Sequence, residues 1–529
     1  MKSSSQNIGV IAVCTAIVWL LVSPEHYFFP QFANTKSDDA SYVAYAMSIA
    51  LDGDLDFSNE IAERLNRFPN RDVRPVHPAG PGLMAAPLVA VLALGDRLTG
   101  HPVIQDRSQL GGSWSYLGFY VASAGAFVGG VLLASRAALA ISKSLSPALL
   151  VFLLSGTGLA FYGLKRFTMG HSFEFFAASL VLYGAWRLSR REQGAARSAL
   201  LIGLGVSLSL LVRPANVNIV LLPFLAHLII DAVPTRSTTI TSKRSLTSLF
   251  AGSALGLSAT FGVNTFLFGT PYPSFRQQYL SGAFDPLDAS SVVSVPTPIM
   301  DPTAQASSVG PLAAAVEFVS DTTPRALDAL SRASELPIVF LTPEFGLLWF
   351  MPIVPLGGVL LIVSLIALWR QRTKRLTSVL IVGLTAVYVL VPLAVILSWR
   401  SIASSFGFRY AFSLVPLGLL GVVLWSARAP RPRVFFFRLV LVPLVILSGF
   451  SILGQIFFVT GPALELTTVS ENSFGRAATG NPNFAFSLVS ALLQSDAWVN
   501  MIARGIPGFV TLVLLSPDDL SVLSSFLGV

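Results

Sequence analysis

The chain has 529 residues, of which 53% are hydrophobic and only 12% are charged, and its formal net charge is +8. A soluble protein of this size carries about twice that share of charged residues, so the composition excludes an ordinary soluble globular protein. The positive charge does not indicate nucleic-acid binding, because the basic residues cluster in short connections between apolar runs. The single cysteine, Cys14, excludes intrachain disulfides and cysteine-rich metal sites.

The first apolar run covers about Ile8–Phe28 and predicts a membrane span. Met1-Lys2 before it is compatible with a signal peptide, but no small-x-small cleavage site follows the run. We therefore expect this span to be a retained anchor.

An acidic pair, Asp38-Asp39, follows the first span before any further long apolar run. Two adjacent carboxylates at a membrane interface are costly to desolvate and repel each other, which favours a chemical use for them. One would serve as a general base and the other would orient a substrate or hold a metal ion. The alternative is that Ser37 or Asp38 only caps a helix that begins near Ala40.

The pair opens a long loop, about residues 29–114, that contains two shorter apolar stretches. These are the amphipathic Ala40–Leu51 and the apolar Pro81–Leu94, and we expect both to lie along the membrane surface. Between them, Arg74 and His77 precede a turn rich in Gly and Pro. Such a turn leading into a helix could hold a phosphate, or it could be a solvated basic loop.

Ten further apolar runs follow, of a length suited to crossing about 30 Å of hydrocarbon. They predict spans at about Ser115–Leu133, Pro147–Gly163, Ser172–Trp186, Ser198–Leu211, Asn216–Ile230, Leu246–Phe268, Phe345–Trp369, Leu376–Leu397, Tyr410–Trp425 and Leu439–Phe458. Alternate connections carry clusters of basic residues, namely Arg136 and Lys143; Arg187, Arg190, Arg191 and Arg197; Arg236, Lys243 and Arg244; Arg370, Arg372, Lys374 and Arg375; Arg428, Arg431, Arg433 and Arg438. All five connections fall on one side of an eleven-span count, so the positive-inside rule predicts a cytoplasmic N-terminus and an outer C-terminus.

Further polar residues lie at the predicted outer ends of spans. They are Lys165, Arg166, His171, Glu174, Arg213, Arg409 and Tyr410. Any one of them could be an interface anchor whose charge lies at the membrane surface. Their concentration on the side that bears Asp38-Asp39 favours a shared site, with cations that suit a lipid-linked phosphate and carboxylates that suit a polar acceptor.

The order of these features resembles membrane glycosyltransferases of the GT-C superfamily, especially bacterial RgtA/B/C/D-like proteins and their protein-mannosyltransferase relatives. That order is a first span, an acidic pair opening a large outer loop, a surface helix and a His-Pro-x-Gly-Pro turn. Similar stretches are Asp39–Asp56, Arg213-Pro, Thr342-Pro-Glu-Phe-Gly-Leu-Leu-Trp349 and Ser405-Phe-Gly-Phe-Arg409-Tyr410. The resemblance covers most of Ile8–Phe458 as a pattern and does not extend into the tail.

The resemblance implies an all-α polytopic membrane protein, with a GT-C-type bundle of about 11 helices in residues 1–458 and an extracytoplasmic segment in residues 459–529. It implies transfer of a sugar from a polyprenyl-phosphate donor to an envelope lipid, glycan or protein at the outer face of a bacterial inner membrane. Asp38 and Asp39 would be catalytic, alone or with a divalent cation such as Mg²⁺ or Mn²⁺. The substrate-binding residues would be Arg74, His77, Lys165, Arg166, His171, Glu174, Arg213, Arg409 and Tyr410.

The alternative is a transporter or flippase of lipid-linked sugars, which would also place cations and carboxylates in a membrane cavity. Such a protein should show internal repeats, short outer loops, and charged or Gly/Pro-broken positions in the middle of spans. His227 and Asp231, near the inner end of the sixth predicted span, are the only such hints in the sequence. A second long outer loop, about residues 269–344, also favours the transferase.

Overall fold

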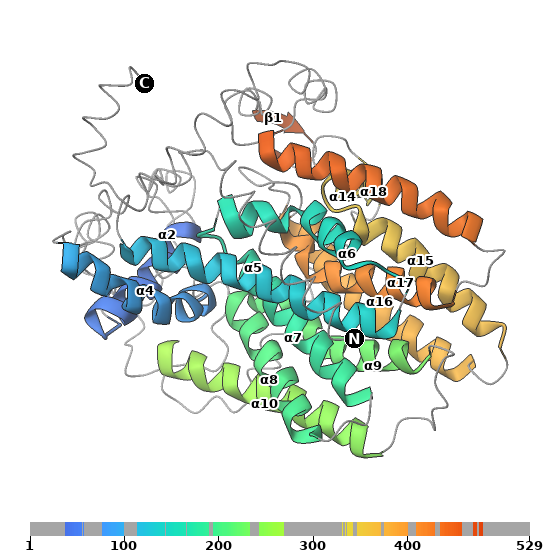
Figure 1. Ribbon diagram of the computed structural model, residues 1–529, viewed down its shortest axis with the longest axis horizontal. Coiled ribbons are helices and arrows are strands. Elements are labelled where there is room, and N and C mark those ends of the chain that lie inside the picture. The colour runs from blue at the N-terminus through green and yellow to red at the C-terminus, as the bar shows by residue number, and fades with distance from the viewer. Residues whose placement is uncertain are drawn as a thin grey trace.

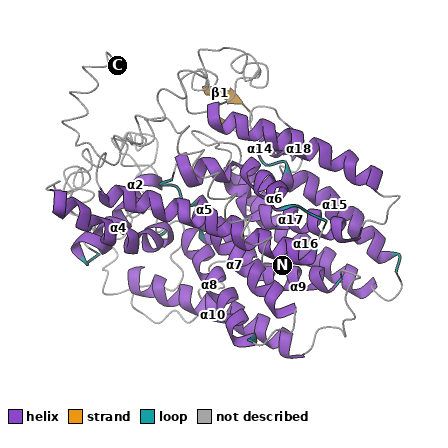
Figure 2. Cartoon of the chain, viewed as in Figure 1, coloured by secondary structure: helices purple, strands orange, loops and turns teal. Residues whose placement is uncertain are grey.

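The computed structural model describes residues 38–55, 57, 77–99, 114–142, 144–165, 167–189, 194–232, 243–268, 331, 334, 336–341, 346–371, 375–399, 409–428, 434–457, 469–472 and 475–479. This part of the chain is helical apart from one short hairpin (Figure 2). The predicted first span, Ile8–Phe28, and most of the second long loop lie outside it.

The first half of the bundle comprises α2 (Asp38–Met47), η2 (Ser48–Asp52), α4 (Gly80–Thr99), α5 (Trp114–Ile141), α6 (Pro147–Leu154), η4 (Ser155–Leu159), η5 (Phe161–Lys165), α7 (His171–Ser189), α8 (Ala195–Val212), η6 (Pro214–Leu221), α9 (Leu222–Asp231) and α10 (Lys243–Phe268). The second half comprises α13 (Leu336–Leu341), α14 (Leu347–Phe350), α15 (Ile353–Trp369), α16 (Arg375–Trp399), η10 (Arg409–Leu414), α17 (Val415–Arg428) and α18 (Val434–Phe457). The strands β1 (Val469–Asn472) and β2 (Gly475–Thr479) pair antiparallel beyond the bundle.

Seven helices in the described part of the chain are long and apolar enough to cross a membrane. Six of them match predicted spans, and these are α5, α8, η6 with α9, α10, α16, and η10 with α17. Three further predicted spans correspond to shorter apolar helices at Pro147–Leu159, Ile353–Trp369 and Leu439–Ile452. The composition and these helices together make the chain a multi-pass, all-α membrane protein, as predicted.

The seventh such helix is α4, which is longer than the apolar stretch Pro81–Leu94 that predicted it. Buried Asp96 near its end accepts hydrogen bonds from the backbone N–H groups of Trp114 (2.7 Å) and Ser115 (2.8 Å). Asp96, in the last turn of α4, therefore caps the start of α5 and fixes the two helices together. The placement of α4 along the membrane surface stays a prediction.

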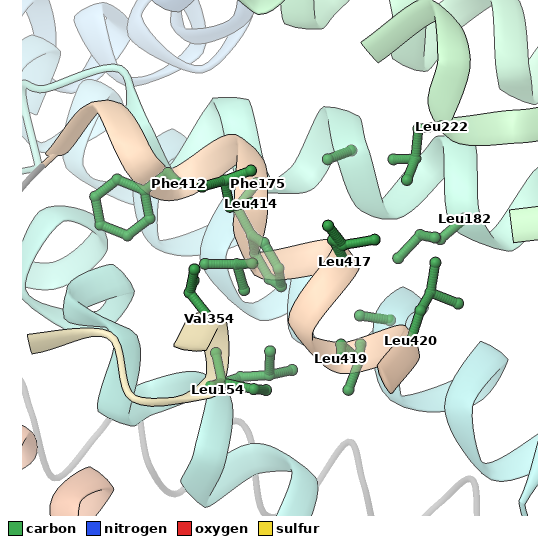
Figure 3. Packing of buried hydrophobic residues seen from close by; sticks show 14 of the residues in the cluster. Leu154, Phe175, Leu182, Leu222, Val354, Phe412, Leu414, Leu417, Leu419 and Leu420 are labelled. Atoms are coloured by element: carbon green, nitrogen blue, oxygen red, sulfur yellow. The ribbon is translucent and has the colours of Figure 1, made fainter. Parts of the chain in front are cut away.

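The helices pack in sequence order in the first half of the bundle. α4 lies against α5, α5 against α7, α7 against α8 and α8 against α10. α2 packs on α4, and these two helices occupy one end of the molecule (Figure 1). In the second half, α15 packs on α17, and α17 carries much of the largest core (Figure 3). There Leu417 and Leu420 of α17 lie with Leu182 of α7, joining the two halves in one apolar core.

The third predicted span is broken in the structure. After α6, the chain forms two π-helical segments, η4 and η5, and Gly158 takes a left-handed conformation with φ +79°. A residue with a side chain is strained at such a φ, so the break needs glycine at this position. A hydropathy pattern averages over the run and does not reveal the break.

Candidate functional site

The best-defined polar cluster surrounds Glu174, in the first turn of α7. Its carboxylate is 1% exposed. One oxygen accepts a hydrogen bond from Asn216 Nδ2 at 2.9 Å, and the other lies 3.2 Å from His171 Nδ1 and 3.8 Å from Arg213 Nη1. An unpaired buried carboxylate would be very costly, so these three partners explain how the charge is tolerated.

Arg213 is placed by the end of α8. It adopts an extended conformation (φ −155°, ψ 108°) because Pro214 follows, and a residue before proline is disfavoured in the helical region. Its guanidinium lies 4.7 Å from the ring centroid of Tyr410, and its side chain is 14% exposed, compared with 1% for the side chain of Glu174. Glu174 is thus the buried member of the ion pair, and Arg213 is the member nearer the surface.

Asn216 is held in η6, two residues after Pro214. In the same segment, Asn218 Nδ2 donates to the backbone carbonyl of Tyr388 in α16 at 3.1 Å. The bond fixes η6 to a helix from the second half of the bundle, and so helps to fix Asn216 toward Glu174.

Two aromatic rings enclose the imidazole of His171. The Tyr162 ring, from η5, lies edge-on with its centroid 4.5 Å away, and the Phe412 ring, from η10, lies 4.9 Å away. Both rings are almost completely buried. Because η5 and η10 are far apart in the sequence, the cluster depends on the folded bundle and not on one local motif.

A second polar group lies where α2 meets the start of α4. His77 is buried, and its Nδ1 lies 3.1 Å from Ser41 Oγ, while the Tyr42 ring approaches edge-on with a centroid separation of 6.0 Å. Ser41 is two residues after Asp39 in the same helix. The structure therefore brings the predicted His-Pro-x-Gly-Pro turn beside the helix that begins with the acidic pair.

Two glycines allow the helix ends that carry these two polar groups to approach each other closely. A Cβ atom on Gly80 would lie 2.4 Å from the backbone carbon of Leu211, next to the residues that lead into Arg213. A Cβ on Gly170, which precedes His171, would lie 2.9 Å from Pro81 Cγ and 3.1 Å from Val212 Cγ1. The start of α4, the end of α8 and the start of α7 therefore meet closely, and no side chain fits between them.

The structure thus gathers Glu174, His171, Arg213 and Tyr410 in one cluster, and places His77 at the adjoining junction. For other predicted residues it describes only the backbone: Asp38 and Asp39 begin α2, Lys165 ends η5 and Arg409 begins η10. Arg74 and Arg166 lie outside the described residues.

Sequence reasoning missed Asn216, Tyr162 and Phe412. Asn216 lies just after the Arg213-Pro214 pair that we did single out, so its position was a usable signal. The two aromatic residues belong to apolar runs and carry no sequence signal that separates them from ordinary core residues.

The other end of α7 holds a separate group. His227 Nδ1 lies 2.9 Å from Ser189 Oγ, and Nε2 lies 3.5 Å from Asp231 Oδ2. The Ser189 hydroxyl donates to the carbonyl of Ala185 at 3.0 Å, so toward His227 it acts as the acceptor. This geometry does not activate the hydroxyl as a nucleophile, and we interpret the group as a clamp between α7 and α9.

Within the described ranges, no group of three or more His, Cys, Asp or Glu side chains is arranged to hold a metal ion. The side chains of Asp38 and Asp39 are not among those that the structure describes, so a divalent cation at the pair stays a prediction.

Comparison with protein-family models finds no match for the chain, and neither does comparison with curated proteins. Among solved structures, the chain is similar to the Archaeoglobus fulgidus oligosaccharyltransferase in its complex with Zn and sulfate (TM-score 0.36, 11% identity, 84% of this chain and 53% of that one). It is also similar to archaeal AglB from the same organism in complex with an inhibitory peptide and a dolichol-phosphate (TM-score 0.37, 12% identity, 97% and 56%). The chain spans about half the length of these proteins. TM-scores this low do not establish a shared fold or function.

Proposed function

We propose that the chain is a GT-C-type membrane glycosyltransferase that moves a sugar from a polyprenyl-phosphate donor to an envelope lipid, glycan or protein. The observation that carries the proposal is the Arg213 guanidinium, which is paired with buried Glu174 beside the junction of α4, α7 and α8. The sequence pattern supports it independently, because an acidic pair opens α2 and the His77 turn packs next to it.

The cluster suits a lipid-linked phosphate for electrostatic reasons. A guanidinium presents five N–H donors in a rigid fork that matches a phosphate, and it stays charged in a partly buried position. Glu174 compensates that charge from the buried side, and the Tyr410 ring packs against the guanidinium. Arg213 would then stabilise the negative charge that develops on the departing polyprenyl phosphate, with Arg409 and His77 as further phosphate contacts.

The acidic pair supplies the other half of the reaction. Asp38 or Asp39 would take the proton from the acceptor hydroxyl as that oxygen attacks the anomeric carbon, and the bond from that carbon to the phosphate oxygen would break. One displacement with a phosphate leaving group inverts the anomeric carbon. A divalent cation at the pair would polarise the acceptor oxygen.

The predicted topology completes the proposal. The basic connections favour an N-terminus in the cytoplasm, so the junction of α2, α4, α7 and α8 would face the outer side of the inner membrane. Residues 1–458 would form the catalytic domain, and residues 459–529 would lie outside the cytoplasm.

A break in the middle of a span is a feature that we expect of the alternative, a transporter of lipid-linked sugars. In a transporter, the freed backbone groups would face the substrate. At the break in η4 and η5, two of them bond to the side chain of Gln455 instead. The break is therefore sealed by protein and does not favour transport.

The test uses purified protein in detergent with a polyprenyl-phosphate sugar and a panel of acceptors. A transferase releases free polyprenyl phosphate, whereas a flippase has no second compartment in detergent and leaves the donor intact. Arg213→Ala should lower release with every acceptor, because the phosphate belongs to the donor, and Arg213→Lys should restore it only in part. Arg97→Ala, at the far end of α4, is the matched control and should keep normal release. An intact donor with the whole panel would contradict the proposal.

A further inference from the structure

The break in the third span is closed by a side chain from the last helix of the bundle. Gln455 of α18 is fully buried. Its Nε2 donates to the backbone carbonyl of Ser155 at 2.8 Å, and its Oε1 accepts from the backbone N–H of Phe161 at 3.0 Å. One amide therefore bridges the two sides of the left-handed Gly158.

This bridge compensates for backbone bonds that a regular helix would make. Unsatisfied N–H and C=O groups are costly within a membrane, and a broken helix is tolerated only where other groups bond to them. α18 also approaches the break closely, since a Cβ on Gly156 would lie 2.6 Å from Ser448 Cβ. Figure 1 shows α18 running past α6, which leads into the break.

The break determines where Tyr162 lies. Phe161 donates its backbone N–H to Gln455, and Tyr162 is the next residue. The ring of Tyr162 packs edge-on against the imidazole of His171. His171 in turn contacts the carboxylate of Glu174, which pairs with Arg213. A continuous set of contacts therefore leads from Gln455 to the guanidinium.

We propose that Gln455 is a positioning residue for the transfer reaction, acting through Tyr162 and His171 on the Glu174–Arg213 pair. The inference rests on the proposed function for its catalytic meaning. By this proposal α18, which is remote from the site in sequence, helps to position the Arg213 guanidinium that contacts the departing phosphate.

The first experiment does not depend on activity. Gln455→Met keeps the length and bulk of the side chain but removes its two hydrogen bonds to the break, together with the one to Ser451 Oγ. Hydrogen–deuterium exchange is followed in the intact protein. We expect exchange to accelerate at least about tenfold in residues 155–165, because the Phe161 N–H and the Ser155 carbonyl each lose their hydrogen bond to Gln455. The acceleration should also reach residues 167–175, where the Glu174 N–H bonds to the Gly170 carbonyl.

The matched control is Thr260→Val in α10, which removes another buried hydrogen bond, from Thr260 Oγ1 to the Gly256 carbonyl. It should leave exchange in both segments unchanged. If Gln455→Met leaves both segments unchanged, or accelerates only residues 155–165, the positioning role is overturned, whatever activity the protein has.

The second experiment measures turnover. Gln455→Met should lower kcat about tenfold and change the donor KM by less than about threefold, because the contact that it positions strengthens as the phosphate leaves. In a Tyr162→Leu background the same change should lower kcat by less than about twofold, since the two residues act in series. Full additivity would overturn the inference. A wild-type protein without transferase activity would refute the proposed function, and the exchange result would still decide the positioning role.

Discussion

Replacing Glu174 with Gln tests whether the buried carboxylate exists to hold Arg213. Gln is nearly isosteric, so its oxygen can keep the hydrogen bond from Asn216 Nδ2 and its amide nitrogen can donate to His171 Nδ1. The change therefore removes little except the negative charge 3.8 Å from Arg213 Nη1.

The magnitude follows from that separation. Two unit charges 3.8 Å apart attract by about 4 kcal/mol at an effective dielectric constant of about 20. Partial exposure of Arg213 reduces this energy, because water screens the charge. We expect Glu174→Gln to lower the free energy of unfolding by about 2–3 kcal/mol, and to lower turnover because Arg213 loses its fixed position.

The assay is a double-mutant cycle, with the free energy of unfolding measured by SDS titration in mixed micelles. Glu174→Gln and Arg213→Gln together should cost about 2 kcal/mol less than the sum of the single changes. The control cycle pairs Arg213→Gln with Asp96→Asn, which removes a buried carboxylate 16 residues along α4 from Gly80. That cycle should be additive to within about 0.5 kcal/mol. If the Glu174 cycle is equally additive, Glu174 and Arg213 have no measurable coupling energy, and the reasoning about the site is refuted.

Other changes test the junction, the acidic pair and the topology. Gly170→Ala should lower the free energy of unfolding by about 1–3 kcal/mol, because its Cβ would meet Pro81 and Val212. Gly262→Ala in α10, with nothing within 4 Å of the new Cβ, should raise it slightly in the same titration. Asp38→Asn and Asp39→Asn should each lower turnover by about 10² or more while donor binding survives, and near-normal turnover in both would exclude a general base at the pair. In a Cys14→Ala background, a cysteine at Ser290 should react with a membrane-impermeant thiol reagent in intact spheroplasts and one at Gln193 should not; labelling at Gln193 alone would reverse the orientation.

Hydropathy was sufficient to predict the helical, multi-pass fold, because length and apolar composition decide which segments cross a membrane. It was not sufficient for the break at Gly158. The bonds that stabilise the break come from Gln455, almost 300 residues later, and no local pattern contains them. The full length of α4 was missed for a related reason, since Asp96 at its polar end is stabilised by bonds to the start of α5.

The site was predictable where charge at the end of a span gave a signal. Glu174, His171, Arg213 and Tyr410 were each selected from their positions, and the structure brings them together. The sequence could not tell which charge is buried and which lies nearer the surface, because that depends on packing between α7, α8 and η10. The catalytic roles of Asp38 and Asp39 stay predictions.

The most direct test of the account is a cryo-EM structure of the protein with a polyprenyl-phosphate sugar bound in a lipid nanodisc. We expect density for the phosphate within hydrogen-bonding distance of the Arg213 guanidinium, with the sugar toward the start of α2. Ser189, which ends α7 and contacts His227 of α9, is 18 residues from the start of α7, about 27 Å along its axis. Phosphate density at that end, with none near Arg213, would contradict the account.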